Sequence, residues 1–439
     1  MPSETGKWHF GVLSITGTGH VNPLISLSRE LKNRGHRLTF FEKPKIAQRV
    51  RDAGLNFCPI EINTFSDREK KRVENDPGLL SAISTLRFNL RRITHDVEGY
   101  LEQMPSVLMQ TGVDALIVDE IALAGPTLAE LLRLPYFLIS TSIPHNFSWK
   151  AFPWYSGYKH SASWFSLVQS RLLEVSALRM HGPIRQALDA CRRRRGLGPI
   201  REMAKAFPAL AQITQMPQCL DLPRKEVPAN FHYAGPFIEM TARPAVDFPW
   251  ERLDGRPIVY ASLGTTRNMQ HRVFRMIAEA CDGLDVQLVI SLGNRLAPEL
   301  LPDLPGNPVV VKFAPQLEIL KLASLVITHC GCNTTLEALL EGKPMIAIPM
   351  AFDQPAVALR LARLKVAEAL PIMRLSSTRI RAAITKTLSD TGYREAAVAI
   401  QSQLRSINGP ARAADVIEGA LARYEAQFDN RAHIELAPA

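Results

Sequence analysis

The stretch THCGCNTTLEALLEGKPMIAIPMAFDQP, residues 328–355, carries polar side chains at the ends of apolar runs. The preceding SLVIT predicts a buried strand, and NTTLEALLEG predicts a short helix with Asn333 as its N-cap and Gly342 just beyond its end. PMIAIP predicts the next strand, which ends close to Asp353 and Gln354. This order of strand, helix and strand is typical of a parallel α/β sheet.

The start of this predicted helix is suited to an anion. A helix that begins at the carboxyl edge of a parallel sheet offers free backbone N–H groups and the positive end of its dipole. Gly331 lets a ligand approach the main chain, and the side chains of Asn333 and Thr334 add donors, with His329 beside them. We therefore expect a phosphate or diphosphate group at this edge.

Neighbouring side chains suit the other parts of a nucleotide sugar. Glu337 lies one turn along the helix, where a carboxylate can accept hydrogen bonds from two ribose hydroxyls. Asp353 and Gln354 combine a carboxylate and an amide, which suit the hydroxyls of a sugar. In FAPQ, Phe313 can stack on a base and Gln316 can reach a ribose.

Another predicted strand ends in YASLGT, which brings Ser262 and Thr265 to the same edge as further donors to a diphosphate. No Asp-x-Asp pair accompanies them, so the sequence predicts no metal chelate at this site.

Near the start of the chain, ITGTGHVNP follows the predicted strand WHFGVLSI. The helix after it is expected to begin with Asn22 as cap and Pro23 in its first turn, and to end before Gly35. The dipole at its start is expected to lower the pKa of His20, which favours the neutral form that a general base needs. Asp119 lies at the end of another predicted strand, DALIVD.

Further predicted strands alternate with helical patterns along the whole chain, as expected of doubly wound α/β domains. Their segments are HRLTFF, PYFLIS, ALAQIT, VQLVIS and PVVVKF. Pro and Gly cluster between residues 232 and 257, which predicts a boundary. We expect a domain over 1–235, a linker over 236–255, a second domain over 256–410, and a helix over 411–439 that packs back on the first domain and frays at its end.

The donor-side segment resembles the nucleotide-sugar signature of family 1, UDP-glycosyltransferase-type enzymes of the GT-B fold. The resemblance implies two Rossmann-like domains that face each other across a cleft. It also implies particular roles. Phe313 and Gln316 would hold uracil and ribose, and Glu337 would hold the ribose diol. His329, with the turn from Asn333 to Thr334, would hold the diphosphate. Asp353 and Gln354 would hold the transferred sugar.

The same resemblance implies that His20 removes the proton of an acceptor hydroxyl with the support of Asp119. Phe313 and Cys332 stand where the plant form of the pattern has tryptophans, which weakens the expected base stacking. The variant AFDQPAVA is most similar to enzymes that glucosylate carotenoids, alongside a macrolide-type bacterial branch. The expected activity is inverting transfer of a hexose, glucose first, from a UDP-sugar to a hydroxyl of an apolar carotenoid, terpenoid, phenolic or macrolide. The UDP-sugar is a co-substrate, and no cofactor or metal is expected.

Three alternatives stay open. A nucleotide-sugar epimerase of the same fold needs no acceptor pocket, and a non-catalytic nucleotide-sugar-binding protein needs no base. A nicotinamide oxidoreductase is the third, although the third glycine of a dinucleotide loop is missing after Gly17 and Gly19.

The aromatic segment HNFSWKAFPWYSGYKHSASWF, residues 145–165, is a candidate acceptor pocket, with Phe147, Trp149 and Trp154 as lining residues, and is otherwise core.

The remaining features concern compartment and partners. Six scattered cysteines indicate reduced core residues. No apolar run reaches the roughly 18 to 20 residues of a spanning helix, and no signal peptide is visible, so we expect a cytoplasmic protein.

The net charge of +10 is partly due to Arg192–Arg195, a predicted solvated helix end that is also a candidate contact for anionic lipid. No aromatic residues alternate with these arginines, so nucleic acid is not an expected partner.

Overall fold

A computed structural model describes residues 6–62, 79–144, 182–200, 207–222, 227–239, 246–264, 270–293 and 296–435. Four predicted site residues lie outside these ranges, so nothing is said of their structure: Thr265 on the donor side and Phe147, Trp149 and Trp154 on the acceptor side.

The first half of the described chain forms a seven-stranded sheet, called the N-terminal sheet, in the order β3-β2-β1-β4-β5-β6-β7. Every neighbouring pair is parallel. The strands are β1 (His9–Leu13), β2 (Arg37–Glu42), β3 (Asn56–Pro59), β4 (Ala115–Asp119), β5 (Tyr136–Ser140), β6 (Ala211–Thr214) and β7 (Phe231–Tyr233).

The second half forms a six-stranded sheet, called the C-terminal sheet, in the order β10-β9-β8-β11-β12-β13, again with parallel neighbours. Its strands are β8 (Ile258–Ser262), β9 (Gln287–Ser291), β10 (Val309–Val311), β11 (Ala323–Thr328), β12 (Met345–Ala347) and β13 (Ala367–Ala369). The predicted fold class, two doubly wound parallel α/β sheets, is therefore confirmed. The limits of the two predicted domains, of the linker and of the C-terminal helix stay a prediction.

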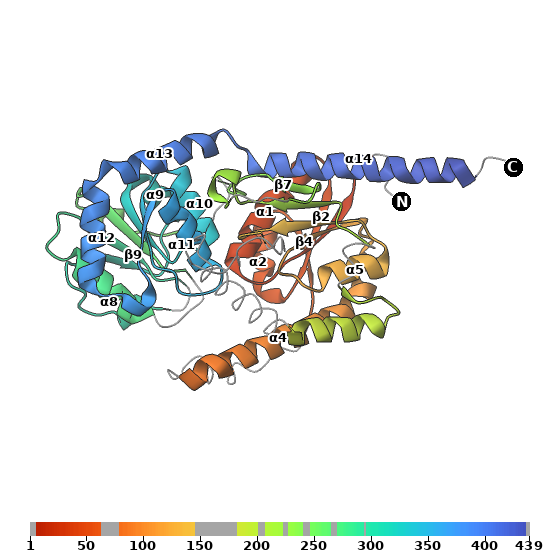
Figure 1. Cartoon of the computed structure of the whole chain (residues 1–439), viewed down its shortest axis with the longest axis horizontal. Coiled ribbons are helices and arrows are strands. Elements are labelled where there is room, and N and C mark those ends of the chain that lie inside the picture. Colours follow the sequence, from red (N-terminus) through yellow and green to blue (C-terminus); the bar gives the residue numbers. More distant parts are fainter. Residues whose placement is uncertain are drawn as a thin grey trace, which may run out of the picture.

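Helices cover both faces of each sheet (Figure 1). With the N-terminal sheet lie α1 (Thr18–Asn33), α2 (Ala47–Asp52), α4 (Leu79–Thr111) and α5 (Gly125–Leu132). After β8 come α8 (Gln270–Cys281), α9 (Gln316–Leu322), α10 (Cys332–Leu340), α11 (Gln354–Arg363), α12 (Ser377–Ser389), α13 (Thr391–Arg405) and α14 (Gly409–Glu435). Residues 182–193 are also helical. The 3-10 helices are η1 (Pro44–Ile46), η2 (Gln218–Leu220), η3 (Trp250–Arg252), η4 (Pro298–Leu300) and η5 (Ile372–Arg374).

The apolar face of α1 is part of the core. Leu24, Leu27 and Leu31 of α1 are fully buried against β1, β2 and β4. Burying a leucine stabilises the fold by about 1.5–3 kcal/mol, so three of them anchor α1 against the sheet. That anchoring holds the start of α1, and with it His20, at the carboxyl end of β1.

The long α14 runs from the side of the C-terminal sheet across to α1 (Figure 1). The Arg34 guanidinium donates to Asp415 and Glu418 at 2.7 Å each. The backbone N–H of Trp8 donates to Nδ1 of His36, which leaves Nε2 of that ring to donate to Glu418 at 3.0 Å. These bonds tie the end of the chain to the N-terminal sheet.

Three short strands escape sequence prediction: β3, β7 and β13. Each is an outer strand of its sheet. An edge strand pairs on one side only and needs no continuous apolar run, so its sequence carries a weak signal. β7 lies partly inside the Pro- and Gly-rich stretch that predicted a boundary.

The prediction that Arg192–Arg195 is a wholly solvated helix end is wrong. Arg192 is 1% exposed, pairs with Glu130 at 2.6 Å and donates to the Thr127 hydroxyl at 3.1 Å. Arg195 donates to the Leu101 carbonyl at 2.6 Å. A guanidinium that satisfies a carboxylate, a hydroxyl and carbonyls is stable when buried, so only the middle of the run is exposed.

Within the described ranges, no helix is both long and apolar enough to cross a bilayer.

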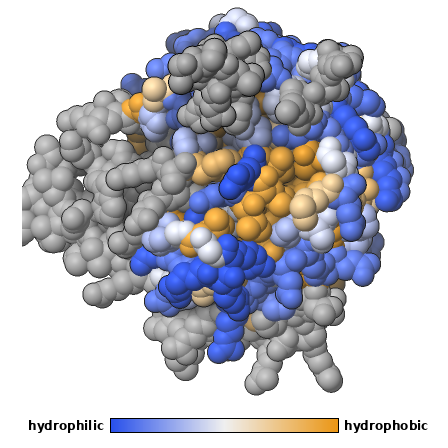
Figure 2. Space-filling model, turned by 90° about the vertical axis from the view of Figure 1, so that its right-hand side faces the viewer, coloured by the Kyte–Doolittle hydropathy of each residue, from blue (hydrophilic) through white to orange (hydrophobic). Residues whose placement is uncertain are grey.

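Seen from the right-hand side of Figure 1, the molecule carries a hydrophobic area among hydrophilic residues (Figure 2). Apolar areas on a surface are typical of contacts with other molecules. All six cysteines are free, and four of them are buried.

Candidate functional site

The predicted site residues gather where the strand order reverses. In the N-terminal sheet the order diverges between β1 and β4, and in the C-terminal sheet between β8 and β11. Ligands of open parallel sheets bind beyond the carboxyl ends of the strands at such points. Asp119 ends β4, Ser262 ends β8, and His20 and His329 follow β1 and β11.

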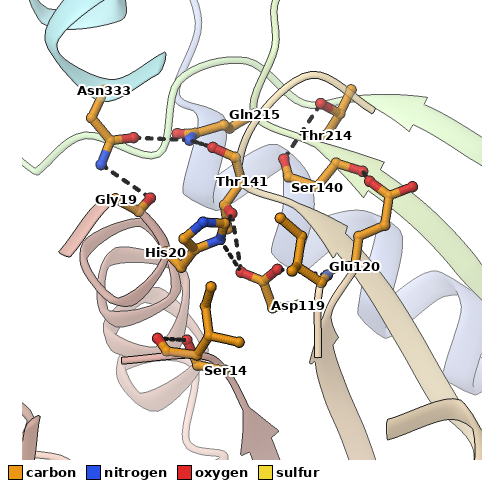
Figure 3. A network of polar contacts seen from close by, with 12 residues as sticks. Ser14, Gly19, His20, Asp119, Glu120, Ser140, Thr141, Thr214, Gln215 and Asn333 are labelled. Carbon is orange, nitrogen blue, oxygen red and sulfur yellow. Dashed lines mark hydrogen bonds and ion pairs between the residues drawn. The ribbon is translucent and has the colours of Figure 1, made fainter. Parts of the chain in front are cut away.

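His20 and Asp119 form a hydrogen-bonded pair, as predicted from the sequence (Figure 3). Nδ1 of His20 lies 3.0 Å from Oδ2 of Asp119, whose side chain is fully buried, while the His20 side chain is 19% exposed. The other carboxylate oxygen accepts from the backbone N–H of Ile121 at 2.9 Å. An ionised carboxylate only accepts, so Nδ1 carries the proton and Nε2 keeps a free lone pair.

The expectation of a lowered pKa for His20 is wrong. Burial lowers the pKa of this imidazole, but the charge and hydrogen bond of Asp119 and the charge of Asp353 outweigh it, so the pKa lies above 6.5. The helix also begins earlier than expected, at Thr18 with Gly17 as N-cap, so Pro23 lies inside it rather than in its first turn.

Thr141 is a residue that sequence reasoning missed. Its hydroxyl lies 2.7 Å from Nδ1 of His20 and 3.0 Å from Oδ2 of Asp119, and the residue is 2% exposed. It directly follows β5, the neighbour of β4. Polar residues that directly follow parallel strands meet at one edge of the sheet, and applying this rule to β5 would have indicated Thr141 from the sequence.

Asn333 is not the N-cap of its helix, contrary to prediction. Gly331 occupies that position and its carbonyl accepts the first helical bond from Thr335, so α10 begins at Cys332. The side chain of Asn333 is therefore free to reach across to the N-terminal sheet. Its amide donates to the carbonyl of Gly19 at 3.2 Å, and its oxygen accepts from Gln215 at 3.0 Å (Figure 3).

Gln215, also missed, follows β6 and is fully buried. Its amide donates to the main-chain carbonyl of Thr141 as well as to Asn333. A continuous chain of hydrogen bonds therefore joins the start of α10 to the pair of His20 and Asp119.

Three predicted donor-side residues contact one another. The Gln316 amide donates to Glu337 at 2.5 Å and lies 3.4 Å from the Thr334 hydroxyl. Tyr260, which the sequence did not indicate, donates to the Gln316 oxygen at 3.0 Å. Glu337 is 2% exposed, so it is no solvated helix residue. Phe313, just before this cluster in the chain, is 37% exposed and is available for stacking.

The His329 ring lies between two glycines. A Cβ added to Gly264 or to Gly331 would approach Nε2 of His329 to 2.6 Å, so only glycine leaves room for the ring at either position. Burial lowers the pKa of His329 to about 4, against a smaller opposing effect of the Ser262 backbone. The ring is therefore neutral at physiological pH and can offer a phosphate one N–H at most.

Asp353 and Gln354 lie at the end of the β12 segment, as predicted. Gln354 is buried, and its oxygen accepts from the backbone N–H groups of Met350 and Ala351 at 2.9 Å each. That oxygen holds the loop, so only the NH₂ group of Gln354 remains for a ligand. The Asp353 charge contributes, after Asp119, to raising the pKa of His20.

The part of the chain that the structure describes contains no group of three or more His, Cys, Asp or Glu side chains placed to hold a metal ion.

Two family models match the chain. Residues 12–143 match the glycosyltransferase family 28 N-terminal domain, and residues 203–407 match the model described as UDP-glucoronosyl and UDP-glucosyl transferase. This chain is a GT-B glycosyltransferase. The first match contains His20, Asp119 and Thr141, and the second contains the donor-side residues from 313 to 354.

Full-length relatives agree with this assignment. The glycosyltransferase is 29% identical to zeaxanthin glucosyltransferase of Pantoea ananas over 93% of this chain and 95% of the relative. It is 27% identical to NDP-glycosyltransferase YjiC of Bacillus subtilis (strain 168), covering 94% and 97% of the two chains. It is 28% identical to oleandomycin glycosyltransferase of Streptomyces antibioticus, covering 97% and 94%.

Solved structures show the same fold. The glycotransferase of kitacinnamycin superposes on this glycosyltransferase with a TM-score of 0.73 at 24% identity, covering 94% of this chain and 99% of the other. The calicheamicin glycosyltransferase CalG4 gives a TM-score of 0.69 at 23% identity, covering 95% and 99%. The family models and the relatives confirm the predicted family and enzymatic nature of the chain, and the solved structures confirm the predicted GT-B fold.

Proposed function

We propose that this enzyme transfers a hexose, with glucose as the first candidate, from a UDP-sugar to a hydroxyl group of an apolar small molecule, with inversion at the anomeric carbon. One observation carries the proposal. The His20–Asp119 pair leaves Nε2 of His20 free, and Asn333 of the donor motif donates to the carbonyl of Gly19, the residue before His20.

The donor would lie along the carboxyl edge of the C-terminal sheet. The start of α10 and the side chains of Ser262, Thr265 and Thr334 suit the diphosphate, with His329 beside them. Glu337 and Gln316 suit the ribose, and the exposed Phe313 the base. Asp353 and the NH₂ group of Gln354 suit the hydroxyls of the sugar.

The reaction follows from the state of His20. Nε2 takes the proton of the acceptor hydroxyl, and Asp119 stabilises the imidazolium that forms. The acceptor oxygen forms a bond to the anomeric carbon from the face opposite the diphosphate, while the bond from that carbon to the diphosphate oxygen breaks and UDP leaves. Helix N–H groups and hydroxyls offset the charge of the leaving group, a role for which we propose no metal or cofactor.

The acceptor class is suggested by the relatives. Zeaxanthin glucosyltransferase and oleandomycin glycosyltransferase are named for a carotenoid and a macrolide acceptor. We therefore place an apolar hydroxylated carotenoid first for this chain and a macrolide second. Phe147, Trp149 and Trp154 stay the predicted lining of the acceptor pocket.

An apolar acceptor of this kind dissolves in membranes. We accordingly propose a cytoplasmic enzyme that contacts anionic lipid through the exposed Arg193 and Arg194. Co-sedimentation with phosphatidylglycerol vesicles that is lost on changing both residues to glutamine is the expected result, and equal sedimentation of the variant would contradict it.

Release of UDP from UDP-glucose tests the main proposal. It is measured with and without zeaxanthin, a macrolide aglycone and a phenol, and the product is analysed for a gain of one hexose and for its anomeric configuration. We expect acceptor-dependent release that His20→Ala lowers by about 10²- to 10⁴-fold, the usual contribution of a general base. His271→Ala, on α8, is the matched control and should retain activity.

Other outcomes lead to other functions. Conversion of UDP-glucose to an isomeric UDP-sugar without acceptor would indicate an epimerase. Tight UDP binding without turnover of UDP-glucose or dTDP-glucose would indicate a nucleotide-sugar-binding protein.

The donor site has its own test. Glu337→Ala should remove the preference for UDP over 2′-deoxy-UDP in calorimetric binding, since a hydrogen bond to a carboxylate contributes about 1.5–3 kcal/mol. A variant that still prefers UDP would rule out Glu337 as the ribose ligand.

A further inference from the structure

The hydroxyl of Thr141 contacts both His20, the proposed general base, and Asp119, which supports it in the proposed reaction. It lies 2.7 Å from Nδ1 of His20 and 3.0 Å from Oδ2 of Asp119 (Figure 3). Thr141 is 2% exposed, so water does not compete for these contacts.

We propose that Thr141 is a positioning residue that reinforces the Nδ1–H tautomer of His20, orients Asp119 and moderates the pull of Asp119 on the imidazole proton, and that Gln215 holds Thr141 in place. The inference rests on the proposed function, in which His20 is the general base. It adds a third residue to the pair, one that touches neither the acceptor nor the sugar in this role.

The selection of the tautomer follows from counting protons. Oδ1 of Asp119 accepts from the Ile121 N–H, and Oδ2 accepts from the Thr141 hydroxyl. With that hydroxyl hydrogen used, the Thr141 oxygen has only lone pairs to offer His20, so Nδ1 must carry a proton. If Nδ1 lacked it, two lone pairs would face the imidazole nitrogen at hydrogen-bonding distance. Nε2 is thereby kept free to accept the proton of a substrate.

The position of Thr141 is itself held by a buried amide. Gln215 is fully buried and uses one amide hydrogen on the carbonyl of Thr141 and the other on the oxygen of Asn333. Its own oxygen accepts from the backbone N–H of Phe237 at 3.4 Å. The hydroxyl of Thr141 therefore belongs to a rigid network whose last member lies on α10, the helix proposed to bind the diphosphate.

Two substitutions separate the hydroxyl from the shape of the side chain. Thr141→Val keeps the shape and loses the hydroxyl, and Thr141→Ser keeps the hydroxyl. We expect Thr141→Val to lower kcat by about 10-fold or more, in the lower range of general-base effects, with KM for the donor unchanged. Thr141→Ser should restore most of that kcat.

The pH profile of kcat gives a readout that a merely structural role would not move. The charged groups that act on His20 are Asp119 of β4 and Asp353 before α11. Without the Thr141 hydroxyl, the Asp119 carboxylate loses a donor and attracts the imidazolium proton more strongly, so the acid limb should move to higher pH in Thr141→Val. The limb should stay in place in Thr141→Ser.

Nitrogen NMR of labelled His20 provides a measurement independent of turnover. The neutral ring should carry its proton on Nδ1 both in the wild type and in Thr141→Val, because Asp119 remains its acceptor. The His20 nitrogen signals should titrate at higher pH in Thr141→Val and at the wild-type pH in Thr141→Ser. UDP binding equal to wild type checks that the variant is folded.

An unchanged pH limb of kcat and an unchanged His20 titration in Thr141→Val, or equal losses in the Val and Ser variants, would overturn the inference. His20→Ala would still test the general base separately. Full activity of His20→Ala would instead overturn the proposed function itself.

Discussion

Asn333 on α10 donates its side-chain amide to the carbonyl of Gly19 on α1, at 3.2 Å. The reason that this carbonyl is open lies four residues on, at Pro23, which has no N–H to complete the helical bond. A proline inside a helix is normally a defect. Here Pro23 leaves the carbonyl of Gly19, one residue before His20, without its helical donor, and Asn333 of the donor motif donates to it instead.

The contacts of Asn333 and Gln215 should be coupled in stability. Gln215→Ala removes the partner of three groups, namely the Thr141 carbonyl, the Asn333 side-chain oxygen and the Phe237 N–H. We therefore expect a loss of about 1–3 kcal/mol in the free energy of unfolding. Combined with Asn333→Ala in a double-mutant cycle, the pair should show about 0.5–3 kcal/mol of coupling in urea denaturation. Gln48→Ala, at an exposed position, is the control. Strict additivity would contradict the contact.

The pH dependence of His20 has a definite sign. Its pKa is raised above 6.5 in the folded enzyme, mainly by Asp119, so its pairing stabilises the fold below 6.5 and that contribution is lost as pH rises through the folded pKa. His20→Ala should therefore cost more stability at about pH 5 than at about pH 9.

The same shift governs activity. A base must be neutral, so kcat should fall as pH drops through a pKa above 6.5. Asp119→Asn should move this acid limb to lower pH while lowering kcat by up to about 10⁴-fold, as a wrong tautomer does. A limb that moves upward or stays in Asp119→Asn would show that Asp119 does not set the pKa.

Gly331 should not tolerate a side chain. Its φ of −63° is open to any residue, so the obstacle is contact alone: a Cβ would lie 2.6 Å from Nε2 of His329. Gly331→Ala should cost about 1–3 kcal/mol, the usual range for overpacking, and weaken UDP binding by displacing the ring. Gly419→Ala in α14 meets no close contact and should stabilise by about 0.5–1 kcal/mol. Equal effects of the two would refute the crowding of His329.

A buried ion pair joins α11 to the segment after β6. Arg360 donates to Asp221 at 3.0 Å, with side chains 6% and 1% exposed, and the Tyr233 hydroxyl donates to the other carboxylate oxygen at 2.9 Å. Arg360→Met should cost about 3–5 kcal/mol because it leaves a buried charge, and adding Asp221→Asn should recover part of that loss. The exposed pair of Asp254 and Arg256 is the control, and Asp254→Asn should leave stability unchanged. No recovery in the double variant would argue against the pairing.

Strands with two neighbours could be predicted because parallel central strands are buried on both faces and read as continuous apolar runs, as in DALIVD and PYFLIS. The edge strands β3, β7 and β13 could not. Helix starts were less accurate, since Asn22 and Asn333 have the side chains of N-caps but Gly17 and Gly331 occupy those positions.

By itself the sequence determined the alternation of strands and helices and the polar residues at strand ends. Its resemblance to a known family implied the pairing of His20 with Asp119, which sheet geometry permits because parallel strands bring their carboxyl ends to one edge. Only the tertiary structure decided which further groups meet there. Thr141 and Gln215 carry no local pattern of their own, and the burial of Arg192 and the raised pKa of His20 depend on partners more than fifty residues away. Such contacts arise from packing, which local periodicity does not record.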